Sequence, residues 1–274
     1  MRLLEVRSWA RTALMVLIAT GSASAIYGDT VVATYQPAGI QTSNTANLCA
    51  GTSLCWVGMQ AFDSSSVPAS GVFPTLVSSG TVTGSISGTY SGTPLIYAAN
   101  AYGGAGGTGY YPEIFASTNG GTGSYSLTLS VSGNIPGVNY FGLWFSALDA
   151  GNQLQFYDGS TLVYTFGPTQ FMSLVGSCAG GNPYCGNPNN GDDSGEQFAF
   201  LNFFDTTGYI TSIVFTETTS AGFESDNFTA AYQDPSNPSG TLIGGTPEPS
   251  SFVLMLSGIL ALIAIGRRAA LKMM

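Results

Sequence analysis

Apolar and polar residues alternate with a period of two along much of the chain, which is the pattern of half-buried β-strands. Side chains that share a face in this way are Tyr125, Leu127, Leu129 and Val131, Leu154 with Phe156, and Ile213 with Phe215. Asp158-Gly159 separates two such segments, and Asp-Gly is a strong signal for a tight hairpin turn. The pattern predicts antiparallel strands that each bury one face.

Shorter apolar segments extend this prediction over residues 26–233. Further strands are predicted at residues 31–35, 55–62, 81–90, 94–98, 140–146, 197–204 and 222–231. The same region is rich in Gly, Ser, Thr and aromatic residues, which suits strands and turns more than helices. About a dozen short strands without a fixed repeat predict an all-β fold, a two-sheet antiparallel β-sandwich or jelly roll.

Three glycine-rich or polar stretches interrupt the alternation. Residues 100–109 (NAYGGAGGTG) and 178–195 (CAGGNPYCGNPNNGDDSG) are predicted to be loops, and residues 234–246 a flexible linker after the sandwich. The first loop formally matches GxGxxG, but no helix follows it, so a dinucleotide site is not predicted. Loops of this length in a compact domain are often functional.

The first 25 residues have the form of a secretory signal peptide. Arg2, Arg7 and Arg11 precede the apolar run LMVLIA, and Ala23-Ser24-Ala25 fits the small-residue cleavage pattern. An uncleaved anchor is the alternative, but the run is short for a hydrocarbon core of about 30 Å. We expect the mature chain to begin near Ile26.

Positive charge is confined to the two ends of the chain. Residues 12–266 contain no Lys, Arg or His, and they hold all 15 acidic residues except Glu5; the formal net charge is −9. Basic ends are retained in the cytoplasm, so the body is expected outside the inner membrane. Without cations it has no surface for nucleic acid, and without His it has no Ser-His-Asp or Cys-His catalytic group.

A three-part pattern occupies residues 247–270. Pro247, Glu248 and Pro249 precede an apolar segment, predicted as a single transmembrane helix over residues 250–266, and Arg267 with Arg268 follows it as a cytoplasmic stop. A plain membrane anchor is the simpler alternative. The order of the three parts resembles the PEP-CTERM sorting signal, although Thr246 stands where an apolar residue is common. The resemblance implies export by the Sec machinery, processing by an exosortase, and delivery to the cell surface or extracellular matrix.

The four cysteines form two close pairs in the sequence. An even number in an exported chain favours disulfides, and proximity favours Cys49 with Cys55 and Cys178 with Cys185, although cross-pairing is also possible. A zinc site made of all four is the alternative. Their spacing lacks the usual CxxC pattern, and no His is present to assist.

Several acidic residues are candidates for chemistry. Asp192, Asp193 and Glu196 are weak candidates for calcium ligands in an oxygen-rich loop, where a solvated acidic loop is the simpler interpretation. Glu224 and Asp226 match the first half of the ExDxxE signature of sandwich-fold glycosidases, but Thr229 replaces the second Glu. No catalytic residue is therefore predicted, and no cofactor is expected unless the loop binds calcium.

Aromatic residues beside the first loop suggest contact with sugars. Tyr102, Tyr110 and Tyr111 are the aromatic residues most expected to be exposed, although aromatic side chains in sandwiches usually pack in the core. We therefore expect a non-enzymatic surface or extracellular-matrix protein associated with extracellular polysaccharide or biofilm. The alternatives are a carbohydrate-binding module and a glycan-active enzyme that uses two carboxylates.

Overall fold

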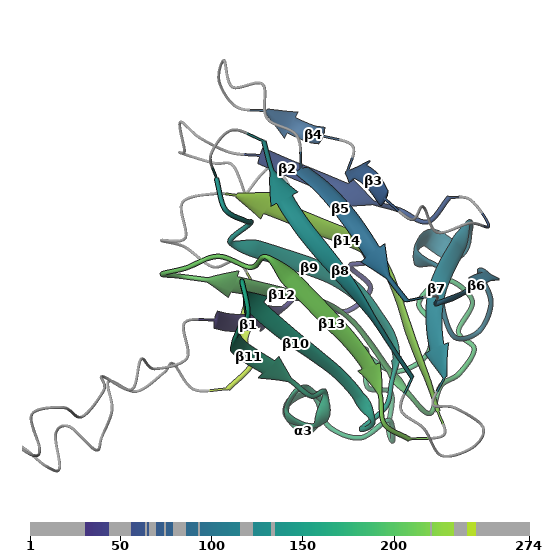
Figure 1. Cartoon of the computed structure of the whole chain (residues 1–274). Coiled ribbons are helices and arrows are strands. Elements are labelled where there is room, and N and C mark those ends of the chain that lie inside the picture. The colour runs from purple at the N-terminus through teal and green to yellow at the C-terminus, as the bar shows by residue number, and fades with distance from the viewer. Residues whose placement is uncertain are drawn as a thin grey trace, which may run out of the picture. The chain divides into compact units, whose positions relative to one another are not determined.

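Two antiparallel β-sheets pack face to face in the computed structural model, so the predicted all-β sandwich is confirmed (Figure 1). The structure describes residues 31–43, 56–63, 65, 70–73, 75–78, 86–92, 94–115, 123–132, 135–219, 221–232 and 240–244, and only the backbone of 70–73 and 75–78. All of them belong to one compact unit, Asp29–Thr246.

The larger sheet has the strand order β15-β1-β12-β9-β14-β2-β4, with β7 paired to β14 and β6 paired to β7. Its strands are β15 (Thr241–Leu242), β1 (Val31–Tyr35), β12 (Gln197–Asp205), β9 (Tyr140–Leu148), β14 (Gly222–Tyr232), β2 (Trp56–Gln60), β4 (Thr75–Ser78), β6 (Leu95–Ala98) and β7 (Tyr110–Phe115). Every pair in this sheet is antiparallel.

The smaller sheet has six strands in the order β11-β10-β13-β8-β5-β3. They are β11 (Thr161–Phe166), β10 (Asn152–Asp158), β13 (Ser212–Glu217), β8 (Gly123–Val131), β5 (Ile86–Ser91) and β3 (Ser70–Phe73). The predicted Asp158-Gly159 hairpin joins β10 to β11, and Gly159 has φ 58°, which glycine adopts without steric cost. One short helix, α3 (Thr169–Val175), follows β11.

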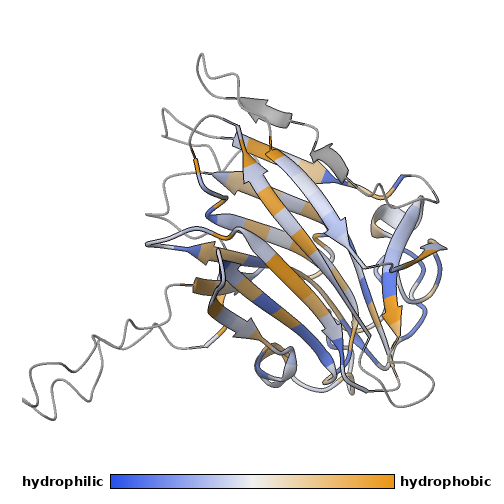
Figure 2. Cartoon of the chain, viewed as in Figure 1, coloured by the Kyte–Doolittle hydropathy of each residue, from blue (hydrophilic) through white to orange (hydrophobic). Residues whose placement is uncertain are grey.

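The core between the sheets is largely aromatic. Phe215 on β13 stacks on Tyr125 of β8 at 4.4 Å between ring centroids, and it also contacts Phe228 of β14 at 5.2 Å. Phe145 and Phe223 of the larger sheet stack at 4.4 Å. Apolar and polar residues alternate along the strands in Figure 2, as the period-two pattern requires.

Several elements differ from the sequence-based prediction. The alternation identified eleven of the strands that the structure contains, but β3, β4, β7 and β15 and the helix α3 were not predicted. β15 pairs with β1 and Ile243 is buried in the core, so the chain returns to the sheet within residues 234–246, the predicted linker.

Both predicted export segments lie outside the described residues. These are the signal peptide at residues 1–25 and the sorting signal at residues 247–270, with its apolar segment. Among the residues that the structure does describe, none belongs to a helix that is long and apolar enough to cross a membrane.

Candidate functional site

A pocket of about 450 Å³ opens beside the edge of the larger sheet where β6 and β7 meet the start of β14. Phe223 on β14 and Phe145 on the adjacent β9 face the core, so their neighbours Glu224 and Ser146 face away from the smaller sheet. The pocket is therefore built on the outer face of the sheet. Residues 100–102 and the segment before β12 complete its wall.

Aromatic rings form one part of the wall. Tyr97, Tyr102 and Phe115 line the pocket and expose 38%, 50% and 44% of their surface, although large apolar side chains are usually covered. Tyr111 is buried beneath them, with its ring centroid 6.1 Å from that of Tyr97. Exposed rings gathered at one concave place indicate a binding surface.

Two carboxyl groups form the floor. Glu113 on β7 and Glu224 on β14 are directly opposite one another in the antiparallel register, and each is 5% exposed. Oε1 of Glu113 and Oε1 of Glu224 lie beside the same position at Gly222, so the two carboxyl groups are adjacent. Burial, together with the neighbouring Glu113 carboxyl, raises the pKa of Glu224 to about 10, and burial also raises the pKa of Glu113. Because two adjacent carboxylates repel, the pair retains a proton at neutral pH.

Glycine at position 222 makes room for this pair. A Cβ there would meet Oε1 of Glu224 and Oε1 of Glu113. Both carboxyl groups therefore lie against the backbone of β14, where any larger residue would push them away. The Gly-Phe-Glu start of β14 is thus part of the site.

Further carboxyl groups surround the pair. Asp149, which follows β9, and Glu196, which precedes β12, line the same pocket. Burial and the charges of Glu217 and Asp193 raise the pKa of Asp149. Burial, with Asp193 and Asp149 nearby, raises the pKa of Glu196 to about 8.

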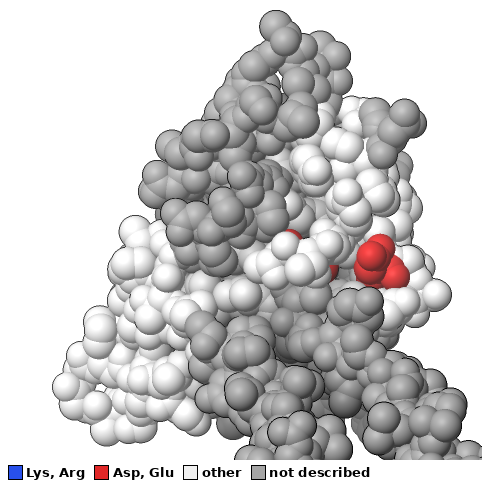
Figure 3. Space-filling view, turned by 90° about the vertical axis from the view of Figure 1, so that its left-hand side faces the viewer, with Lys and Arg blue, Asp and Glu red and all other residues white. Residues whose placement is uncertain are grey.

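No basic side chain among the described residues balances these groups, because residues 12–266 contain no Lys, Arg or His. The face of the molecule in Figure 3 shows acidic side chains and no basic one among its described atoms. The described carboxyl groups therefore have no basic side chain to pair with, and burial raises the pKa values of Glu113, Asp149, Glu196 and Glu224 without a cation to oppose it.

Asn100 organises the aromatic wall. Its Oδ1 accepts hydrogen bonds from the hydroxyl of Tyr111 at 3.0 Å and from the backbone N–H of Tyr102 at 2.8 Å. The Asn187 amide donates to the carbonyl oxygens of Asn100 and Ala101 at 3.0 and 3.2 Å. The two predicted loops are thus connected, and the second loop supports the first.

Asp226 fixes the other end of the first loop. Its Oδ2 accepts a hydrogen bond from the backbone N–H of Ala105 at 2.8 Å, and its Oδ1 accepts one from Asn227 at 2.6 Å. Burial raises the pKa of Asp226 to about 6, although these backbone donors oppose the shift. Asn189 donates to the carbonyl of Gly104 at 3.2 Å. Side chains from β14 and the second loop therefore hold a loop that has little regular structure of its own.

Two β-bulges lie in β9 and β14, strands that both contribute residues to the pocket. In the first bulge, Ser146 and Ala147 of β9 lie opposite one residue of β12, and Ala147 has φ 47°. In the second, β14 has an extra residue opposite β9, and Asn227 there has φ 49°. Bulges with left-handed residues redirect the side chains that follow them and are frequent beside active sites. The bulge at Ala147 comes directly before Leu148 and Asp149, which carries a carboxyl group into the pocket.

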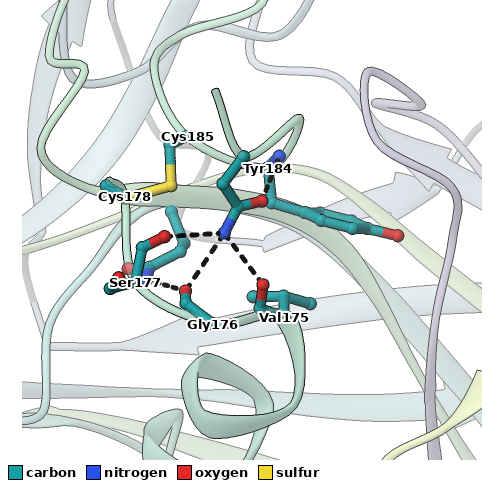
Figure 4. The surroundings of a disulfide bond; sticks show 8 residues. Val175, Gly176, Ser177, Cys178, Tyr184 and Cys185 are labelled. Atoms are coloured by element: carbon teal, nitrogen blue, oxygen red, sulfur yellow. Dashed lines mark hydrogen bonds between the residues drawn. A yellow bond between two sulfur atoms is a disulfide. The ribbon is translucent and has the colours of Figure 1, made fainter. Parts of the chain in front are cut away.

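One disulfide stabilises the second loop. Cys178 and Cys185 are bonded, with their Cα atoms 5.4 Å apart, so this predicted pair is confirmed (Figure 4). The amide of Asn182, between them, donates to the carbonyl oxygens of Val175 and Gly176 at 2.9 and 3.1 Å. The loop therefore leaves α3 in a fixed direction. The other predicted pair, Cys49 and Cys55, lies outside the described residues.

The predicted candidates are only partly brought together. The pocket is lined by Glu224, Tyr102 and Tyr111. Asp226 instead accepts a hydrogen bond from the first loop, and Tyr110 does not line the pocket. Of the calcium candidates, Glu196 reaches the pocket, Asp193 lies beside it, and Asp192 is exposed. The described residues contain no group of three His, Cys, Asp or Glu side chains that could hold a metal ion.

Sequence reasoning missed Glu113, Asp149, Tyr97 and Phe115. Glu113 and Phe115 belong to β7, which was not predicted because it follows the glycine-rich loop and contains Pro112. The alternation of Tyr111, Glu113 and Phe115 was the signal that could have identified the strand. Comparison with protein families, with curated proteins and with solved structures finds no match to this chain.

Proposed function

We propose that this chain is an exported surface or extracellular-matrix protein that binds polysaccharide through the pocket on the outer face of its β-sandwich. The observation that carries the proposal is the gathering of exposed Tyr97, Tyr102 and Phe115 above buried carboxyl groups. Aromatic rings offer flat apolar faces to sugar rings, and carboxyl oxygens accept hydrogen bonds from sugar hydroxyls. The acidic body would repel anionic polymers, so neutral glycans are the expected partners.

Replacement of Tyr102 by Ala is expected to weaken glycan binding about five- to thirtyfold, because loss of a stacked ring costs on the order of 1–2 kcal/mol. The side chain is half exposed and lies on a loop held by backbone contacts, so the fold should be retained. A glycan array identifies a bound glycan, and calorimetry of that glycan with both proteins measures the loss. Leu162→Ala, an equally exposed apolar residue on β11, is the matched control and should bind like the parent.

The sorting part of the proposal depends on the two ends of the chain. Residues 1–25 would direct export. An exosortase of the PEP-CTERM system would then recognise Pro247, Glu248 and Pro249, while Arg267 and Arg268 stay in the cytoplasm. Extended Pro-Glu-Pro suits a processing enzyme, because proline prevents helix through the motif. We also propose that the sandwich is of the jelly-roll type.

Deletion of the host exosortase is expected to leave the tailed precursor in the inner membrane. Cell fractionation with an antibody against the body measures its location, and Glu248→Ala in the normal host should reproduce the defect. Undiminished surface delivery in the deletion strain would refute sorting by the exosortase.

The carboxyl pair supports binding over glycan hydrolysis. A retaining glycosidase places its two carboxyl groups about 5–5.5 Å apart and an inverting one about 6.5–9.5 Å apart. Oε1 of Glu113 and Oε1 of Glu224 instead lie beside the same position at Gly222, closer together than either arrangement requires. Release of new reducing ends during the binding assay would revive the enzymatic alternative.

A further inference from the structure

We propose that the pocket selects glycans that carry protonated amino groups, an inference that rests on the proposed function and specifies its ligand. Four carboxyl groups line the pocket, and two more, Asp193 and Glu217, lie near enough to raise the pKa of Asp149. The described residues, all within 12–266, supply no Lys, Arg or His to neutralise them. A ligand that brings its own positive charge would provide the missing counter-ion.

One carboxyl oxygen of the pair lacks a hydrogen-bond donor. Oε2 of Glu224 is buried and has no hydrogen-bond partner among the described residues, although Oε1 of the same group lies with Glu113 against Gly222. The side chain is 95% buried and lines the pocket. An acceptor without a donor in a pocket is unusual in proteins and indicates a missing partner.

An ammonium group has the complementary chemistry. It presents three N–H donors and no acceptor, whereas the floor of the pocket presents carboxyl oxygens. The rings of Tyr97, Tyr102 and Phe115 add the aromatic faces that attract organic cations. Calcium, by contrast, requires six to eight oxygen ligands, and aromatic faces supply none. The wall therefore favours an amino sugar over a divalent cation.

Binding of a cation should also release protons. Without a ligand, Glu224 and Glu196 have pKa values of about 10 and about 8, so both retain protons at mildly acidic pH. The titratable groups that face them are Glu113, Asp149, Asp193, Tyr97, Tyr102 and Tyr111, and none is basic. A bound ammonium lowers these carboxyl pKa values, and the displaced protons enter the buffer.

Calorimetry with two hexamers of equal length tests the inference in the purified protein. One is made of N-acetylglucosamine and is neutral; the other is its deacetylated counterpart. At about pH 6 the cationic hexamer is expected to bind at least about tenfold more tightly. It should also release about half a proton or more per site, measured in two buffers of different ionisation enthalpy, while the neutral hexamer releases none.

Three variants locate the effect. Glu224→Gln and Glu196→Gln keep the shape of the side chain but cannot release a proton, so each should reduce the preference for the cationic hexamer about fivefold or more. Because Glu196 is partly exposed, Glu196→Gln is expected to fold, and it provides the test if Glu224→Gln folds poorly. Asp158→Asn removes an equal charge at the β10–β11 turn and should leave the preference unchanged.

The outcomes separate this inference from the proposed function. Binding of the neutral hexamer as tightly as the cationic one overturns the amine preference and leaves glycan binding intact. Failure of both hexamers and of every glycan on the array overturns both. If Asp158→Asn loses the preference to the same extent, the net charge alone attracts the ligand. If the protein binds calcium stoichiometrically and Glu224→Gln abolishes that binding, the pocket is a metal site. Either result overturns the inference.

Discussion

Thermal stability is expected to rise as the pH falls from about 8 to about 5, by about 2–4 °C per pH unit. Carboxyl groups usually have lowered pKa values in folded proteins and destabilise them in acid. Here the direction is reversed, because burial without cations raises the pKa of Glu224 from 4.5 to about 10. Between those values the folded state holds a proton that the unfolded state has lost, so stability decreases with rising pH by about 1.4 kcal/mol per unit.

Calorimetric melting curves across this range measure the slope, and Glu224→Gln tests its origin. The glutamine cannot ionise, so the variant should have a flatter dependence and exceed the parent in stability near pH 8. Asp158→Asn, at the turn between β10 and β11, should keep the slope of the parent. A melting temperature that is constant or increases from pH 5 to pH 8 would contradict the assignment of a retained proton to this pair.

Truncation of Phe215 to Ala is expected to destabilise the sandwich by about 3–5 kcal/mol. The ring is fully buried at the contact of the two sheets, where it meets Tyr125, Phe228, Phe223 and Phe141. Its loss would leave a cavity between rings that are fixed by β13 and its neighbours. Urea unfolding measures the change.

Two comparisons separate packing from the general loss of apolar surface. Phe215→Leu keeps much of the volume and should cost clearly less than the Ala variant. Leu162→Ala, on the exposed side of β11, should change the free energy of unfolding by less than about 0.5 kcal/mol. A cost for Phe215→Ala of under about 1 kcal/mol would mean that the two sheets do not meet at this ring.

The sequence predicted the fold well because strand alternation is a local property. Residues 125–131 bury every second side chain, and the Asp158-Gly159 turn joins its strands as expected. The prediction failed where local signals conflict. Pro112 and the preceding glycines concealed β7, and α3 begins after a proline with no polar side-chain cap. β15 is too short to have a recognisable pattern.

The site was less predictable because it is assembled by pairing between distant strands. Glu113 and Glu224 are 111 positions apart (224 − 113), and only the register of β7 against β14 brings them together. No spacing in the sequence indicates that register. Asp149 enters the pocket after a bulge at Ala147, and alanine gives no sign of a left-handed backbone. The cysteine pair, by contrast, was predictable because it closes a short loop.

The side chains that hold the first loop in place contact its backbone. Asp226, Asn187 and Asn189 bind only backbone atoms of that loop, at Ala105, Asn100, Ala101 and Gly104. Gly103 and Gly104 are required, since a Cβ would meet the Tyr111 ring or Ala99. Position 102 has no such requirement. The side chain at position 102 can therefore be replaced, and the ligand preference changed, without loss of the contacts that hold the loop. Binding loops vary in the same way on a constant immunoglobulin domain.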